Sequence, residues 1–176
     1  MKKFFAILGI ILLLFVAYIW YTFKSGGKGP KGPKPVSLAV SKHSPAFNQS
    51  IQTVLDAYYN MSEGFVTWDT VAVARHANEL KTALDSLKID ELKVDTTGIY
   101  ESALDPLSNV KNETANILKE PSIDKKRTSF NLLSENLRLL FIVVKYDQGK
   151  LYWQECPMAF GEGYAGNWIS KTDAVR

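Results

Sequence analysis

The sequence has little of the chemistry that most enzymes and metal sites use. It contains one cysteine, Cys156, and two histidines, His43 and His76, in 176 residues. A single cysteine excludes a disulfide within the chain, and two distant histidines exclude a local His-x-x-x-His pair. His43 falls in the tether or at the start of the first helix, and His76 lies beside Arg75 on the second, so we expect both histidines to be solvated. The sequence also lacks a GxSxG elbow, a phosphate-binding glycine loop and an HExxH motif, so it predicts a protein that is not an enzyme.

A strong excess of charge is also missing. The formal net charge is +3, and it is unevenly distributed. Six of the 21 basic residues lie at positions 2–34, which leaves 15 against all 18 acidic residues in the remainder. A mildly acidic domain lacks the basic face that nucleic acid requires, so we predict no nucleic-acid partner.

One long apolar run is present, at residues 4–23, and it carries no charge. Twenty helical residues extend about 30 Å, which matches the thickness of a bilayer core. Tyr18, Trp20 and Tyr21 gather at its end, where aromatic residues favour the membrane interface. A cleaved signal peptide is the alternative, but the flank after the run is bulky. We predict a transmembrane anchor at residues 1–24, with the lipid bilayer as its partner. Lysines flank both ends of the run, so charge leaves its orientation open.

Glycine, proline and lysine dominate the next stretch, SGGKGPKGPKP at residues 25–35. This composition excludes a packed core and predicts a solvated tether over residues 25–43. Its lysines could instead rest on anionic headgroups. The helical domain is then predicted to span residues 44–176.

Apolar residues recur at helical spacing through most of that domain. Ser44 followed by Pro45 predicts the start of the first helix, and Gly64 its end. Four helices are predicted: residues 44–64, residues 67 or 69 to about 87, residues 96–119, and residues 121 to about 144. Their expected buried stripes are Phe47, Ile51, Val54, Leu55 and Tyr58; Val73, Ala77, Leu80, Leu84 and Leu87; Tyr100, Leu104, Leu107, Val110, Ile117 and Leu118; and Phe130, Leu133, Leu137, Leu140 and Val144.

Long helices with short joints predict an all-α fold, an up-down four-helix bundle. Pro106 is expected to kink the third helix or delay its start. After Gly149 the pattern changes to a short strand at residues 151–155 and a glycine-containing loop. The complete prediction is one N-terminal transmembrane helix, the bundle, and a short C-terminal β-hairpin or loop segment in which Trp168 and Ile169 fold back on the bundle.

The soft donors Cys156 and Met158 lie two residues apart across Pro157. A thiolate and a thioether together favour Cu(I) over hard cations, so we predict Cys156 and Met158 as metal ligands and Cu(I) as the metal. The alternative is that both are ordinary packing residues in a metal-free domain. In that case the aromatic residues near Trp153 and Trp168 would dock a protein partner.

Several motifs resemble one known family. They are Arg127-x-x-Phe130-x-x-x-Ser134, Leu151-Tyr152, Cys156-Pro157-Met158-Ala159 and Trp168-Ile169-Ser170. Over residues 46–176 the chain resembles the bacterial domain of unknown function 3347, a small exported helical domain associated with adaptor subunits of heavy-metal efflux pumps. The resemblance implies a single-pass inner-membrane protein with its domain on the periplasmic side, an efflux adaptor or other envelope protein as its partner, and copper bound at Cys156 and Met158. Family members continue with Asn-Pro-Tyr-Phe-Gly, a further methionine and a second cysteine, so these two residues supply half of that ligand set.

Overall fold

The computed structural model describes residues 12–13, 15–21 and 43–174. The chain divides into two compact units, residues 1–37 and 38–176. In the first unit, residues 12–13 and 15–21 are helical. More than half of the predicted span, and the predicted tether up to residue 42, lie outside the described residues. Within the part described, no helix combines the length and apolarity that crossing a bilayer requires.

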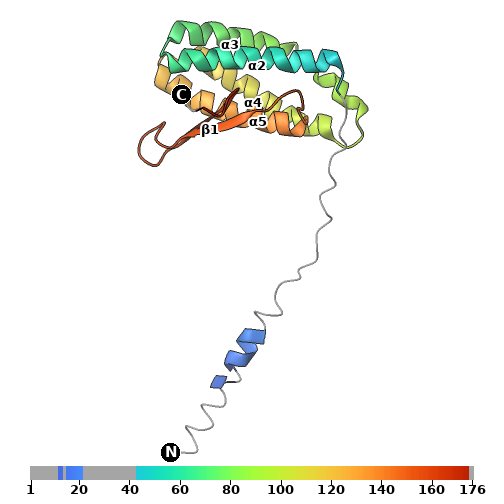
Figure 1. Ribbon diagram of the computed structural model, residues 1–176, viewed down its shortest axis with the longest axis vertical. Helices are drawn as coiled ribbons and strands as arrows, with labels where there is room; N and C mark the ends of the chain where they lie inside the picture. Colours follow the sequence, from blue (N-terminus) through green and yellow to red (C-terminus); the bar gives the residue numbers. More distant parts are fainter. Residues whose placement is uncertain (1–11, 14, 22–42, 175–176) are drawn as a thin grey trace, which may run out of the picture. The chain divides into compact units, whose positions relative to one another are not determined.

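The second unit is mostly helical and ends in a two-stranded hairpin (Figure 1). Helices α2 and α3 pack together as one layer, and α4 and α5 as another, with α3 against α4 and strand β2 against α5. The elements are α2 (Pro45–Val66), α3 (Thr70–Asp85), the 3-10 helix η1 (Ile89–Val94), α4 (Ile99–Lys119), α5 (Ile123–Val143), β1 (Tyr152–Cys156) and β2 (Gly166–Ser170).

Side-chain caps set the start of three helices. The Ser44 hydroxyl accepts from the backbone N–H of Phe47, so the predicted start at Ser44-Pro45 is confirmed. Asp69 accepts from two amides at the start of α3, and Ser122 accepts from that of Lys125 at the start of α5. These oxygens satisfy N–H groups that have no partner within the helix.

The predicted stripes form most of the core. Every expected position of the first, second and fourth predicted helices is buried, including Leu87 and Val144, which lie just past the ends of α3 and α5. On α4, Leu107, Val110 and Ile117 are buried, and Tyr100 and Leu118 are partly buried. Leu104 is exposed, which corrects that prediction. Pro106 lies inside α4, which begins at Ile99, so the alternative of a late start is wrong.

Gly64 does not end the first helix, because α2 continues to Val66. The glycine instead permits a close approach between helices. A Cβ atom at residue 64 would lie 3.0 Å from both the backbone N and the Cγ2 atom of Val73 on α3. The missing side chain therefore lets the end of α2 pack directly on α3.

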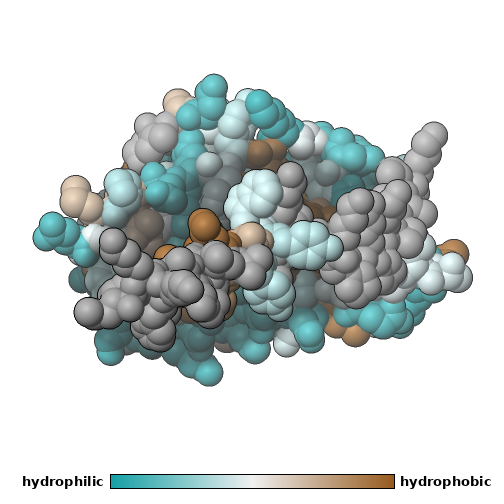
Figure 2. Space-filling model, turned by 90° about the horizontal axis from the view of Figure 1, so that it is seen from below, coloured by the Kyte–Doolittle hydropathy of each residue, from teal (hydrophilic) through white to brown (hydrophobic). Residues whose placement is uncertain are grey.

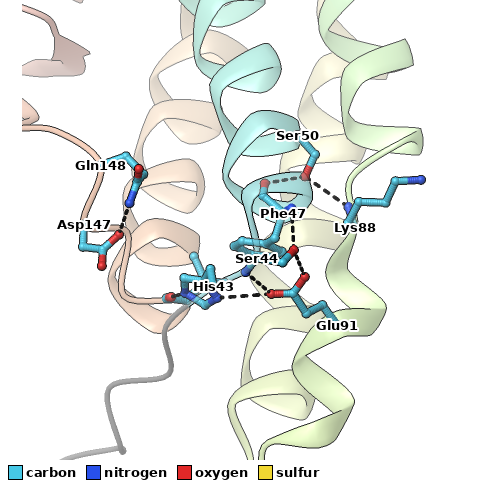
Figure 3. A network of polar contacts seen from close by, with 9 residues as sticks. His43, Ser44, Phe47, Ser50, Lys88, Glu91, Asp147 and Gln148 are labelled. Atoms are coloured by element: carbon cyan, nitrogen blue, oxygen red, sulfur yellow. Dashed lines mark hydrogen bonds and ion pairs between the residues drawn. The ribbon is translucent and has the colours of Figure 1, made fainter.

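A polar network holds the start of α2 (Figure 3). The Glu91 carboxylate of η1 accepts from the backbone N–H of Ser44 at 2.8 Å and from the Ser44 hydroxyl. His43 Nε2 donates to the carbonyl of Val144 at the end of α5, at 2.5 Å. The His43 side chain stacks on Phe47 and is only 2% exposed, so the expectation that it is solvated is wrong. His76 lies on α3, where its Nδ1 is 2.7 Å from the Glu79 carboxylate.

The C-terminal hairpin is antiparallel, with Tyr152 opposite Ser170 and Cys156 opposite Gly166. The predicted strand at residues 151–155 is confirmed as β1, shifted by one residue. Ile169 is buried against the helices and Trp168 packs on the core, as expected for a segment that folds back on them.

Candidate functional site

A buried hydrogen-bond chain fixes the hairpin to the helices. The backbone N–H of Ile169 donates to the Tyr58 hydroxyl at 3.0 Å. That hydroxyl lies 2.7 Å from Ser134 Oγ, which donates to the carbonyl of Phe130 at 2.7 Å. Because the Ser134 hydroxyl donates its one proton to Phe130, the Tyr58 hydroxyl must be the donor in its bond to Ser134 Oγ. Burial raises the pKa of Tyr58 above its usual range, which keeps the phenol neutral.

A second contact fixes the same edge of β2. The backbone N–H of Asn167 donates to Asn131 Oδ1 on α5 at 2.6 Å. Residues 167 and 169 alternate with those bonded to β1, so their N–H groups point away from the hairpin partner. Side chains from α5 and α2 thus accept hydrogen bonds from the free N–H groups on the edge of β2 that faces the helices. These bonds set the position of the whole hairpin.

The loop between the strands folds back on itself. The N–H of Ala159 donates to the carbonyl of Cys156 at 3.3 Å, and that of Phe160 to the carbonyl of Tyr164 at 3.1 Å. Gly166 makes this arrangement possible, because a Cβ atom there would lie 2.7 Å from the Cβ of Ala159. The loop therefore lies against β2 and holds Phe160 beside the first turns of α5.

The turn between α2 and α3 places Trp68 nearby. The N–H of Asp69 donates to the carbonyl of Gly64 at 2.9 Å, and that of Trp68 to the carbonyl of Phe65 at 3.2 Å. This is the Schellman pattern, in which the left-handed position usually holds glycine. Here Trp68 occupies it, with φ of 55°. A residue with a Cβ atom in this conformation costs about 1 kcal/mol.

These segments enclose a groove of about 300 Å³ between the end of α2, the start of α5 and the hairpin loop. We call it the aromatic groove. Its walls are mainly aromatic, and its one charged residue among those described is Arg127. The aromatic side chains that line it are Phe65, Trp68, Phe130, Phe160 and Trp168.

A second groove, of about 390 Å³, lies between the end of α5 and β1. Arg138 and Trp153 line it, and the guanidinium carbon lies 5.1 Å from the Trp153 ring centroid. Lys145, which also has a left-handed backbone with φ of 54°, lines it as well. In Figure 2, which views the molecule from below, the apolar areas are small and separated by hydrophilic residues.

The predicted ligands Cys156 and Met158 fall in the turn that follows β1. Cys156 is partly buried and lines the aromatic groove. Met158 is 68% exposed and is not among the lining residues. In the part of the chain described, no three side chains of the His, Cys, Asp and Glu types form a cluster that could hold a metal. The turn after β1 offers one thiol and one thioether, which suit a soft metal but are fewer donors than a closed site uses.

The two tryptophans proposed for docking differ in exposure. Trp153 is exposed, and Trp168 is partly buried where it lines the aromatic groove. Sequence patterns did not identify Trp68 or Arg127 as site residues. Arg127 entered only as part of the family motif Arg127-x-x-Phe130, and the left-handed position of Trp68 is visible only in the structure.

The helical part of the chain matches one protein family. Residues 54–148 match the family described as "Protein of unknown function (DUF3347)". The chain belongs to this family. The DUF3347 match covers the four long helices from the middle of α2 to the end of α5, and it ends before Cys156. No curated protein and no solved structure gives a significant match to the chain.

Proposed function

We propose that this DUF3347 protein is a membrane-anchored, non-enzymatic binding module, a four-helix bundle of up-down topology on the periplasmic side of the inner membrane. Its aromatic groove docks another envelope protein, for which an efflux adaptor is our first candidate, and this docking requires no metal. The observation that carries the proposal is Trp68, a large aromatic residue held at a left-handed position where glycine would cost less. Backbone strain of this kind concentrates at functional sites.

The side chains around Trp68 support the same function. Trp68 and Val66 are exposed at the rim, while Phe65, Phe130 and Trp168 form the interior of the groove. Aromatic residues with an apolar body and a polar edge are enriched in the centres of protein interfaces. The groove also lies on rigid elements, because the buried Tyr58 chain fixes the hairpin wall.

The docking function is tested by photo-crosslinking with the full chain in its native membrane. The crosslinking residue p-benzoylphenylalanine would replace Val66 at the groove or, as the matched control, Val94 in η1. The side chains are 46% and 85% exposed, respectively. We expect one discrete protein adduct from position 66 and none from position 94. Identical adducts at both positions, or none at position 66, would reject docking at the groove.

A second candidate is Cu(I) handling by the turn after β1, as an accessory of metal efflux or homeostasis. The N–H of Ala159 closes that turn on the carbonyl of Cys156, so the Cys156 thiol and the Met158 thioether belong to one compact turn. The thiolate would be the stronger ligand and the thioether the weaker one, with any further donor supplied by the partner.

Cu(I) titration of the full chain in detergent against a competing chelator tests this candidate. Cys156→Ser is expected to abolish binding, because it removes the only thiolate. Met158→Leu should weaken binding, whereas Met61→Leu, a change at a buried core position, should leave it unchanged. Unaltered affinity in the Cys156 variant would eliminate the copper candidate and leave the docking function intact.

A further inference from the structure

Arg127 is positioned by two aromatic rings from different parts of the chain. It lies in the second turn of α5, and its guanidinium carbon is 5.2 Å from the Trp68 ring centroid and 5.9 Å from that of Phe160. Trp68 belongs to the α2–α3 turn and Phe160 to the hairpin loop. Ring faces attract a guanidinium group while its N–H groups remain available at the edge of the plane. The rings thus hold Arg127 ready to donate to an acceptor in the groove.

The surroundings of Arg127 favour an anion as that acceptor. Of the described residues that line the groove, none is acidic, and the polar ones besides Arg127 and Cys156 are Ser62, Asn131 and Asn167. A positive charge beside aromatic walls is partly removed from water, which strengthens a charge-assisted hydrogen bond. Guanidinium and carboxylate groups also match in shape, because two parallel N–H groups meet two oxygens.

The size of the groove sets how much of a ligand enters it. A volume of about 300 Å³ lies at the lower end of the range for ligand sites, so it accommodates one large apolar side chain together with a carboxylate. The mouth of the groove has an apolar rim, formed by the exposed side chains of Val66 and Trp68. Met158 is also exposed, and in sequence it lies between Cys156 and Ala159, which line the groove. This rim offers contacts to a chain that leads into the groove.

We propose that the aromatic groove binds the carboxy-terminal residue of the partner protein. The free terminal carboxylate pairs with Arg127, and an aromatic or branched apolar side chain packs between Phe65, Phe130 and Trp168. The preceding residues of the partner lie along the rim. This inference rests on the docking function proposed above and names the group that the groove recognises.

Peptide titration of the full chain in detergent tests the inference. The probe is an acetylated pentapeptide that ends in leucine-phenylalanine, prepared with a free carboxylate or with a terminal amide, and binding is measured calorimetrically. The free acid is expected to bind at least about tenfold more tightly than the amide, since a hydrogen bond to a charged group has that effect. Arg127→Met should remove the difference between acid and amide. Arg138→Met is the matched control, because Arg138 stacks on Trp153 in the second groove, and it should leave the difference unchanged.

Alkylation of Cys156 gives a second, independent measurement. Because Cys156 is the only cysteine and lines the groove, the free-acid peptide should slow its reaction with iodoacetamide in the wild type but not in Arg127→Met. A misfolded variant would instead react faster without peptide, so loss of folding is distinguished from loss of binding.

Three results would overturn the inference. Equal affinity of the wild type for the acid and the amide would show that the carboxylate is not recognised. If Arg138→Met removed the acid–amide difference as fully as Arg127→Met, the carboxylate would not be bound specifically in the aromatic groove. If 4-phenylbutyrate bound as tightly as the peptide, the groove would be a site for small organic acids. In each case a discrete crosslink at position 66 would still support docking, so the two proposals fail separately.

Discussion

Tyr58→Phe is expected to lower the free energy of unfolding by about 2 kcal/mol, because it leaves the buried N–H of Ile169 without an acceptor. The ring of the phenylalanine fills the same space, so the effect isolates the hydroxyl group. Tyr59→Phe is the matched control, since Tyr59 is the next residue and is only partly buried; we expect a change below about 0.5 kcal/mol. Chemical denaturation followed by circular dichroism measures both, and hydrogen exchange at the Ile169 amide should accelerate only in the Tyr58 variant.

The pH dependence of the same variant gives a further check. Burial raises the folded-state pKa of Tyr58 above the ordinary value of 10.0. As the pH rises above 10, the unfolded tyrosine loses its proton while the folded one keeps it, so the wild type loses stability. The stability difference between wild type and Tyr58→Phe should therefore be fully present below pH 10 and should shrink above it. Equal losses in the Tyr58 and Tyr59 variants would contradict the role of the buried chain.

Leu137→Ala is expected to cost about 3 kcal/mol of unfolding free energy. Leu137 is fully buried in the middle of α5, and truncating such a side chain removes its burial and leaves a cavity. Leu139→Ala is the matched control on the same helix, because Leu139 is 48% exposed, and it should change stability by about 0.5 kcal/mol or less. Similar losses in both variants would show that the stripe on α5 does not face the core.

The helices were predictable because their signals are local. The stripe through Phe130, Leu133 and Leu137 repeats at the helical period, and a periodic stripe places its residues on one face whatever packs against it. Caps such as Ser44 act within four residues of themselves. The prediction that Leu104 is buried was wrong because α4 has apolar residues on more than one face, and only packing decides which of them is covered.

The aromatic groove was not predictable, because its parts meet only in the folded chain. Arg127 lies between Trp68 and Phe160, which come from distant segments and have no shared sequence pattern. His43 was misjudged for the same reason, since its acceptor is the carbonyl of Val144 at the end of another helix. The chemistry of Cys156 predicts a metal ligand, which stays a prediction, whereas its position in the groove follows from the pairing of β1 with β2.

The network around His43 and the aromatic groove lie at opposite ends of α2. His43 and Ser44 precede its first residue, whereas Phe65 and Val66 at its end line the groove. A helix of 22 residues extends about 33 Å. Tension on the chain before residue 43 would be borne first by the bonds to Glu91 and Val144. The end of α2 that meets the proposed tether and the end that lines the proposed docking groove are thus separated by the length of one helix, so strain at the first end need not disturb the second.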